Sequence, residues 1–277
     1  MDADPSDTAR TVARRLALPV YLPWVLVTLG RGMLLPVVPL YLRDAGLSYT
    51  LVTVVVASAG IGAVLAGLPV GRAAQRFGPE WLFVSSTLLS ALMATLLGVS
   101  TAVLALVAFH LALGFGSVGL RIGVQMIVNG AVPGELRGRA MSLVGGGVRI
   151  AFFVGPLVGG VLVDVVGFSA TFAVCGLLTV SGLVPFVSAR GTTDGTQRFG
   201  RPPPSPAGVF GALRRHGGLL LLAGSGTALV MTVRAGRNVI VPLIGDDLEL
   251  SATAVGALVA IGTGADLLLF PVAGYLM

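Results

Sequence analysis

The residues of this chain that could do chemistry lie inside long apolar stretches, where polar groups are costly. They are five arginines, one aspartate and one histidine: Arg31, Arg121, Arg149, Arg234, Arg237, Asp266 and His110. An arginine at the centre of a membrane helix costs about 2.5–3.5 kcal/mol on insertion scales, so it is retained where it faces a wet cavity or an opposite charge. These residues are therefore candidates for lining a polar cavity or for carrying a proton.

Two of them can change protonation state. Asp266 is the acidic residue nearest the middle of an apolar stretch. Its protonation would depend on its burial and on any nearby arginine, so a change of conformation could load it with a proton and release it. A static ion pair with Arg31, Arg234 or Arg237 is the alternative. His110 is the second proton-coupling candidate, although a histidine on an apolar helix is more commonly a hydrogen-bonded interior side chain.

The arginines have a different use, which is to hold a substrate. Arg31, Arg149, Arg234 and Arg237 are the substrate-cavity candidates, and Arg237 lies on the same helix face as Arg234. Such groups hold an anion through charge-assisted hydrogen bonds. Arg121 is instead expected to extend toward the membrane surface.

The composition places these residues in a membrane protein. Hydrophobic residues make up 55% of the 277 residues, charged residues only 11%, and the mean hydropathy is +0.94. Too few charges remain to cover a soluble globule, which excludes a water-soluble enzyme. The arginines are scattered between apolar runs, so nucleic acid is not expected as a partner. No cluster of Cys and His suggests a metal, no cofactor is expected, and a single Cys175 cannot form an internal disulfide.

The elements that must position these residues are membrane helices, which need about 20 apolar residues each. The sequence predicts spans at about 16–42, 51–74, 81–100, 102–128, 139–163, 168–187, 218–244 and 252–276. The fold class is thus an all-α integral membrane bundle. The predicted domains are a cytoplasmic segment (1–15), a six-helix bundle (16–187), a cytoplasmic linker (188–217) and the start of a second bundle (218–277).

Charge predicts the orientation of these spans. If the N-terminus is cytoplasmic, the inner segments hold most of the arginines, among them Arg72, Arg76, Arg137 and Arg139. The outer loops then hold a single arginine, Arg43, beside several acidic residues. The bias fits the positive-inside rule and predicts a multi-pass protein of the inner (plasma) membrane.

An internal repeat relates the two ends of the chain. Residues 31–74 align with 234–277 without a gap, and shared positions include Arg31/Arg234, Pro39/Pro242, Asp44/Asp247 and Ser48/Ser251. Helices 1 and 2 therefore recur as helices 7 and 8. Parallel six-helix repeats are a transporter architecture, in which Arg31 and Arg234 would face each other across a central cavity. The second copy stops two helices in, so we expect a truncated chain that lacks four helices.

Several segments, taken in order, resemble the major facilitator superfamily, and within it the proton-linked drug exporters. "LLPVVPLYL" (34–42) resembles its first helix, "GRAAQRFG" (71–78) its loop between helices 2 and 3, and "ELRGRA" (135–140) its loop between helices 4 and 5. "GGGVRIAFFVGPLVGG" (145–160) resembles the helix-5 antiporter motif, and "GFSATF" (167–172) the entry to helix 6.

The resemblance implies roles for further residues. Gly71, Gln75, Arg76, Gly78, Arg137 and Arg139 would belong to the gating loops, and Gly147, Gly155, Pro156, Gly159 and Gly160 to the helix-packing motif. The chain departs from the family at Gln75, where the loop signature has an Asp that pairs across the cytoplasmic gate. It departs again at His110, where the helix-4 motif has Arg.

Together these observations predict a secondary transporter that is not an enzyme. The leading hypothesis is an antiporter for efflux, exporting a small molecule in exchange for protons by alternating access. Its partners would be the substrate, protons, the lipid bilayer and a missing portion of four helices. The alternatives are an organic-anion transporter, suggested by the arginines, and a non-transporting truncated membrane protein that needs a partner.

Overall fold

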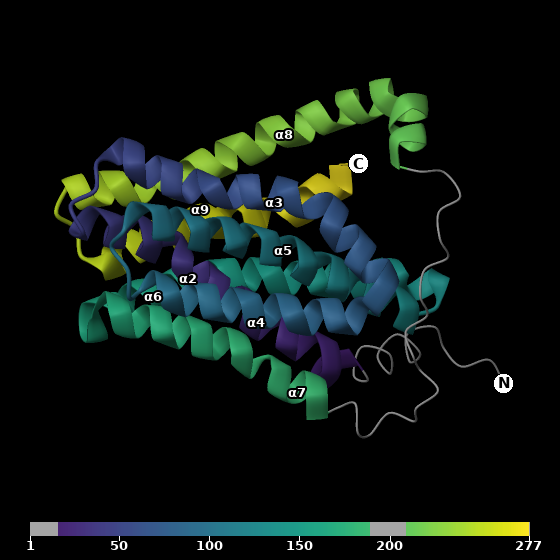
Figure 1. Cartoon of the computed structure of the whole chain (residues 1–277), viewed down its shortest axis with the longest axis horizontal. Coiled ribbons are helices and arrows are strands. Elements are labelled where there is room, and N and C mark those ends of the chain that lie inside the picture. Colours follow the sequence, from purple (N-terminus) through teal and green to yellow (C-terminus); the bar gives the residue numbers. More distant parts are fainter. Residues whose placement is uncertain (1–15, 189–208, 277) are drawn as a thin grey trace.

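The computed structural model describes residues 16–188 and 209–276, and over this part of the chain it is helical without a strand. In 209–276, side chains are described for 217, 218, 221, 222 and 224–265. The helices are α2 (Leu22–Asp44), α3 (Tyr49–Phe77), α4 (Pro79–Leu97), α5 (Val103–Ala131), α6 (Arg137–Ser181), α7 (Leu183–Ser188), α8 (Val209–Asp247) and α9 (Ala252–Leu276), with short turns η1 (Ala17–Tyr21) and η2 (Gly134–Leu136). The long helices run side by side along the long axis of the molecule (Figure 1).

Within the described residues, six helical segments are long and apolar enough to cross a membrane. One of them, Gly134–Ser188, has 55 residues and contains two of the predicted spans. It bends at Gly167, where φ is 80° and ψ is 174°. This backbone conformation is open to glycine and strained for other residues, so Gly167 lets the chain reverse between the two arms of α6. The predicted break between 163 and 168 is placed at this bend.

The turns between paired helices show the repeat in three dimensions. The turn from α2 to α3 and the turn from α8 to α9 have the same backbone hydrogen bonds, displaced by 203 residues. Ser48 and Ser251, which are repeat equivalents, cap α3 and α9 by accepting from the N–H three residues ahead. The matched bonds join Ala45 to Tyr41, Gly46 to Arg43, Leu47 to Leu42 and Val52 to Ser48, and then Leu248 to Ile244, Glu249 to Asp246, Leu250 to Gly245 and Val255 to Ser251.

The first helix lies against both arms of α6. On α2, Gly30 faces Thr179 of the second arm, while Gly32 faces Ala151 of the first arm. A methyl group at Gly32 would lie 2.6 Å from the Ala151 carbonyl oxygen, so only a glycine permits this approach. Two clusters of buried apolar side chains extend the contact, one around Trp24 and one around Tyr41.

Helix α8 contacts the first six helices at one end of the molecule, whereas α9 packs on α6 along its described length. Near its Asp247 end, α8 buries Pro242 and Gly245, and it meets α2 there. On the other part of α8, Leu221 and Leu222 are each 76% exposed. Figure 1 shows α8 meeting the bundle at the left and diverging from it at the right. We call these the Arg43 end, where the halves touch, and the Arg76 end.

The beginning of α8 differs from the sequence prediction. The helix starts at Val209, inside the segment 188–217 that was expected to be a linker. The residues that follow Pro206 include alanine, leucine and arginine, which favour helix, and the part of α8 that is apolar enough to cross a membrane is Gly224–Asp247. The predicted segment 1–15 and residues 189–208 of the linker lie outside the described residues.

Candidate functional site

The stretch of α6 from 145 to 160 supplies the closest helix contacts with α2. A methyl group at Gly155 would lie 2.7 Å from the backbone carbonyl carbon of Gly32, and one at Gly159 would lie 2.7 Å from the carbonyl oxygen of Met33. A methyl group at Gly147 would lie 2.9 Å from Val25. Real side chains do not tolerate such distances, so these glycines set how closely α6 and α2 approach.

The same stretch also contacts α9, which belongs to the second copy of the repeat. Gly160 lies against the carbonyl of Ala252, and Gly256 lies against the carbonyl of Pro156. Deeper along the pair, the Thr263 hydroxyl donates a hydrogen bond to the Phe152 carbonyl at 2.9 Å. The motif stretch is therefore shared by two interfaces, one inside the first half and one between the halves.

A carboxylate of α6 caps the beginning of α9. Asp164 accepts hydrogen bonds from the backbone N–H groups of Ala252 at 3.1 Å and Thr253 at 2.8 Å. These N–H groups have no partner within their own helix, and the positive end of the helix dipole favours a negative charge there. The first half thus provides a cap for a helix of the second.

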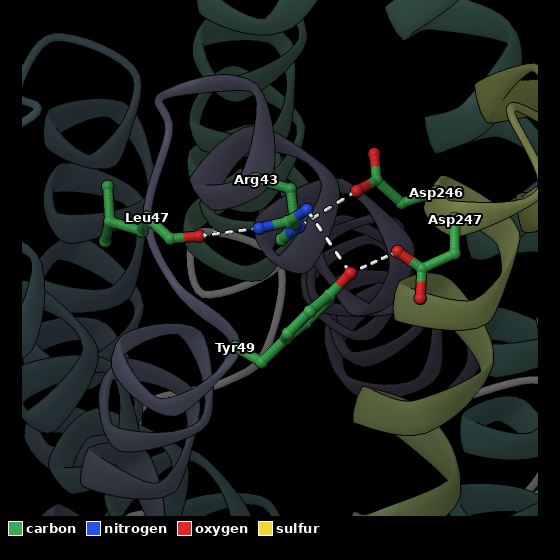
Figure 2. Close-up of polar contacts among 5 residues, drawn as sticks. All are labelled: Arg43, Leu47, Tyr49, Asp246 and Asp247. Atoms are coloured by element: carbon green, nitrogen blue, oxygen red, sulfur yellow. Dashed lines mark hydrogen bonds and ion pairs between the residues drawn. The ribbon is translucent and has the colours of Figure 1, made fainter.

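Arg43 makes the second polar connection between the halves, at the same end of the molecule (Figure 2). Its Nε lies 2.9 Å from Oδ2 of Asp246 at the end of α8. Its Nη1 donates to the Leu47 carbonyl at 3.0 Å, and its guanidinium carbon lies 4.2 Å from the centre of the Tyr49 ring. The Tyr49 hydroxyl in turn donates to Asp247. Two side chains of the first half therefore hold two adjacent carboxylates of the second.

The arginines predicted to line a cavity lie in different surroundings. Arg31 is partly buried on α2, and the positive charge of Arg121 on α5 acts on it. Among the described residues Arg31 has no hydrogen bond or ion pair. Arg121 is exposed on α5, and its predicted extension toward the membrane surface stays a prediction.

The other arginines contact backbone carbonyls or lie on the open part of α8. Arg149 donates to the Gly145 carbonyl of its own helix at 3.4 Å. Arg237 donates to the Gly262 carbonyl at 2.9 Å, which ties α8 to α9. Arg234 is exposed on α8. The predicted placement of Arg31 and Arg234 across a central cavity stays a prediction.

The two proton-coupling candidates lie in different halves. His110 on α5 is 8% exposed, and its Nδ1 has no hydrogen-bond partner among the described residues. The backbone of Asp266 continues α9, but its side chain lies outside the described residues. The predicted roles of both residues stay predictions.

A sequence profile of the Major Facilitator Superfamily matches residues 24–277, which is most of the chain. The chain belongs to this superfamily. Its relatives include an MFS-type transporter of Methanocaldococcus jannaschii, 21% identical over 164 residues, and multidrug resistance protein 1 of Bacillus subtilis, 27% identical over 150 residues. The matches cover 58% and 52% of this chain but 42% and 39% of those relatives, so the chain spans less than half of their length.

Solved structures of the superfamily show the same fold. A bacterial homologue of the human lysosomal transporter Spinster, in an inward-facing and unoccupied conformation, matches 99% of this chain and 63% of its own with a TM-score of 0.75 and 18% identity. A D-xylose–proton symporter matches 91% of this chain and 66% of its own with a TM-score of 0.64 and 15% identity. The chain is therefore a multi-pass membrane protein of a transporter family and not an enzyme.

The loops expected to gate a superfamily protein lie at the Arg76 end. Gly78 ends α3 with a φ of 87°, a value that suits glycine, while Gly71 has open space around it. Gln75 is exposed there. Arg76 lies over the Phe77 ring at 5.1 Å, and Arg137 donates to the Val132 carbonyl at 3.2 Å while Arg139 is exposed.

Sequence reasoning missed the polar contacts at the Arg43 end. Arg43 and Asp246 entered the prediction only as charges that fix the orientation, Asp247 entered also as the repeat equivalent of Asp44, and Tyr49 did not enter it. A signal was present, because the repeat offset of 203 maps Arg43 onto Asp246. Two opposite charges at equivalent positions of a superfamily repeat are a candidate pair across its axis.

Proposed function

We propose that this chain works as a proton-coupled exporter of a small molecule, by alternating access between its two halves. The Arg43 end would face outward and the Arg76 end would face the cytoplasm, in the inner membrane and with a cytoplasmic N-terminus. The state described here would be open to the cytoplasm, because the halves touch at the Arg43 end and diverge at the other.

The observation that carries this proposal is the double packing of α6. Its stretch 145–160, which resembles the family's antiporter motif, lies against α2 within one half and against α9 of the other. Glycine backbones without side chains let helices approach and slide with little obstruction. A helix shared in this way transmits a change in one half to the other. The relation to multidrug resistance protein 1 also supports export of a small molecule.

The charges at the two ends support the orientation. The Arg76 end carries Arg72, Arg76, Arg137 and Arg139 on loops and helix ends. The Arg43 end carries one arginine beside Asp44, Asp246, Asp247 and Glu249. Arginine-rich segments are retained on the cytoplasmic side of a membrane, which supports a cytoplasmic position for the Arg76 end.

Everted membrane vesicles test the proposal. With respiration energising the membrane, lipophilic cations such as ethidium, Hoechst 33342 and tetraphenylphosphonium should accumulate in vesicles that contain the protein. Nigericin, which collapses the pH gradient, should abolish this uptake, whereas valinomycin, which collapses the potential alone, should leave most of it. Uptake that survives nigericin would contradict proton coupling, and vesicles without the protein provide the background.

A second candidate function is transport of an organic anion. Arg31 favours it, because this cationic side chain is partly buried on α2 and makes no hydrogen bond or ion pair among the described residues. An anionic group would supply a counter-charge to Arg31 and accept charge-assisted hydrogen bonds from it. Uptake of fluorescein that is insensitive to nigericin, and that Arg31→Gln removes, would favour this candidate over the first. Absence of both fluxes would favour a membrane protein that does not transport by itself.

A further inference from the structure

We infer that Arg43 and Tyr49 of the first half, with Asp246 and Asp247 of the second, form a latch that holds the outer end of the molecule closed and is broken in each transport cycle. We call these four residues the outer latch. The inference rests on the proposed alternating access, since it names the groups that hold one of its two states. It assigns to these side chains a role in setting an equilibrium between conformations.

The geometry of the latch joins the two halves through one guanidinium and one hydroxyl. Arg43 uses separate nitrogens for separate tasks, with Nε on Asp246 at 2.9 Å and Nη1 on the Leu47 carbonyl at 3.0 Å. The bond to Leu47 fixes the side chain to its own half. The Tyr49 ring lies under the guanidinium, and its hydroxyl reaches across to Asp247 (Figure 2). Both carboxylates are therefore held by groups that stay with the first half.

A second contact on another helix pair closes the same end. Asp164 of α6 caps the N-terminus of α9 through Ala252 and Thr253. When the halves separate, these N–H groups would turn to water or to the hydroxyl of Ser251, which already accepts from the N–H of Ala254. Separation therefore leaves no polar group stranded, which keeps the motion reversible.

The exposure of the latch indicates that it can open. The Arg43 and Asp246 side chains are 24% and 32% exposed. Ion pairs with this access to water are screened and contribute little, and their loss changes an equilibrium by about 2- to 5-fold. Beneath the latch lie apolar contacts, among them Leu40 of α2 against Ala252 and Val255 of α9.

The chain offers a direct reporter of opening. Cys175 is its only cysteine and is buried, so Cys175→Ala gives a background without reactive thiols. Leu40→Cys then places one thiol under the latch, at a position that is 7% exposed. Thr50→Cys is a matched control that stays exposed at the same end. Val27→Cys, at a position that is fully buried in the first half, reports loss of the fold.

The experiment measures how fast membrane-impermeant methanethiosulfonates modify these thiols in right-side-out vesicles. Arg43→Ala and Asp246→Ala should each raise the rate at Leu40→Cys about 2- to 5-fold. The rise should occur with the cationic and the anionic reagent alike, since a change of local charge alone would favour one of them. Tyr49→Phe, which removes only the hydroxyl, should give a smaller rise.

Swapping the two charges tests whether the ion pair between Arg43 and Asp246 holds the outer end closed. Arg43→Asp places three carboxylates together and should give the largest rate, and adding Asp246→Arg should return the rate toward that of the parent. Unchanged rates in Arg43→Ala and Asp246→Ala, with Thr50→Cys modified normally, would overturn the latch, as would failure of the swap to restore the rate. The assay needs no substrate, so it tests the latch independently of transport. If the latch variants behave as expected but the protein shows no proton-driven flux, the proposed coupling is overturned and the latch is retained.

Discussion

Arg43 and Asp246 are equivalent positions of an internal repeat, 203 residues apart, and their side chains form an ion pair at 2.9 Å. Equivalent positions of two parallel repeats meet only close to the axis that relates them. Two unchanged copies would place like residues opposite each other, and two arginines or two aspartates would repel. A change of sign at one of the two positions converts this repulsion into an attraction. Divergence of the repeat is thus what permits the two halves to hold together at this end.

The same repeat makes a prediction about backbone strain. The turn after α2 has Gly46 at a φ of 79°, and the matching turn after α8 has Glu249 at a φ of 53°. A residue with a side chain pays about 1–2 kcal/mol in the left-handed region, whereas glycine does not. Gly46→Glu should therefore lower the free energy of unfolding by about 1 kcal/mol. Thermal midpoints in detergent measure it, with Gly138→Ala, which has open space around it, as the control. An unchanged midpoint would show that the turn adjusts without strain.

The two contact faces of α6 predict two different phenotypes. Gly155→Leu pushes against the backbone of Gly32 inside the first half, and overpacking of this kind costs about 1–3 kcal/mol. The protein should lose thermal stability. Gly160→Leu pushes instead against Ala252 of α9 and should separate the halves while the first half stays folded.

The reporter thiol at Leu40→Cys distinguishes these outcomes. Gly160→Leu should raise its rate of modification and leave the fully buried control Val27→Cys unreactive. Gly155→Leu should make both thiols reactive or prevent expression. Gly71→Ala, at a glycine with open space around it, should change neither rate. Equal effects of the two leucine substitutions would show that the faces are not separable.

Sequence reasoning predicted the spans because length and hydropathy decide which segments can cross a membrane. It predicted the position of the bend at Gly167 for the same reason, since 55 residues of helix are too long for one crossing. The helices are apolar on nearly all sides, and lipid and protein neighbours look alike in such a pattern. Their sequence therefore could not say that α6 packs on both α2 and α9.

The candidate site was harder to predict than the fold. The arginines inside spans were found because placing a charge in a membrane helix is energetically costly. This cost does not reveal which group binds the arginine. Arg237, for example, donates to the Gly262 carbonyl, which no sequence pattern marks. Arg43 and Asp246 were missed because charges at helix ends are common and inexpensive. Only the repeat offset connects them, and it shows equivalence of positions without showing that the two residues touch.

Replacing His110 should affect thermal stability and proton-driven uptake differently. It is buried, and its Nδ1 has no partner among the described residues. An unpaired polar atom in the interior costs about 1–3 kcal/mol, so His110→Leu should keep the thermal midpoint or raise it. If His110 carries a proton, the same variant should lose uptake driven by the pH gradient. A lower midpoint would show that the imidazole has a bonding partner in the membrane.

Asp266 is the first candidate to test for proton coupling, and two substitutions separate the role of its charge from the role of its size. Asp266→Asn keeps the shape of the side chain but cannot release a proton, so uptake of the lipophilic cations into everted vesicles should lose its dependence on the pH gradient. Asp266→Glu keeps the carboxyl group and should retain part of the coupled uptake. Thermal midpoints of both variants should match that of the parent, which separates coupling from folding. Full nigericin-sensitive uptake by Asp266→Asn would remove Asp266 from the mechanism and leave His110 as the remaining candidate.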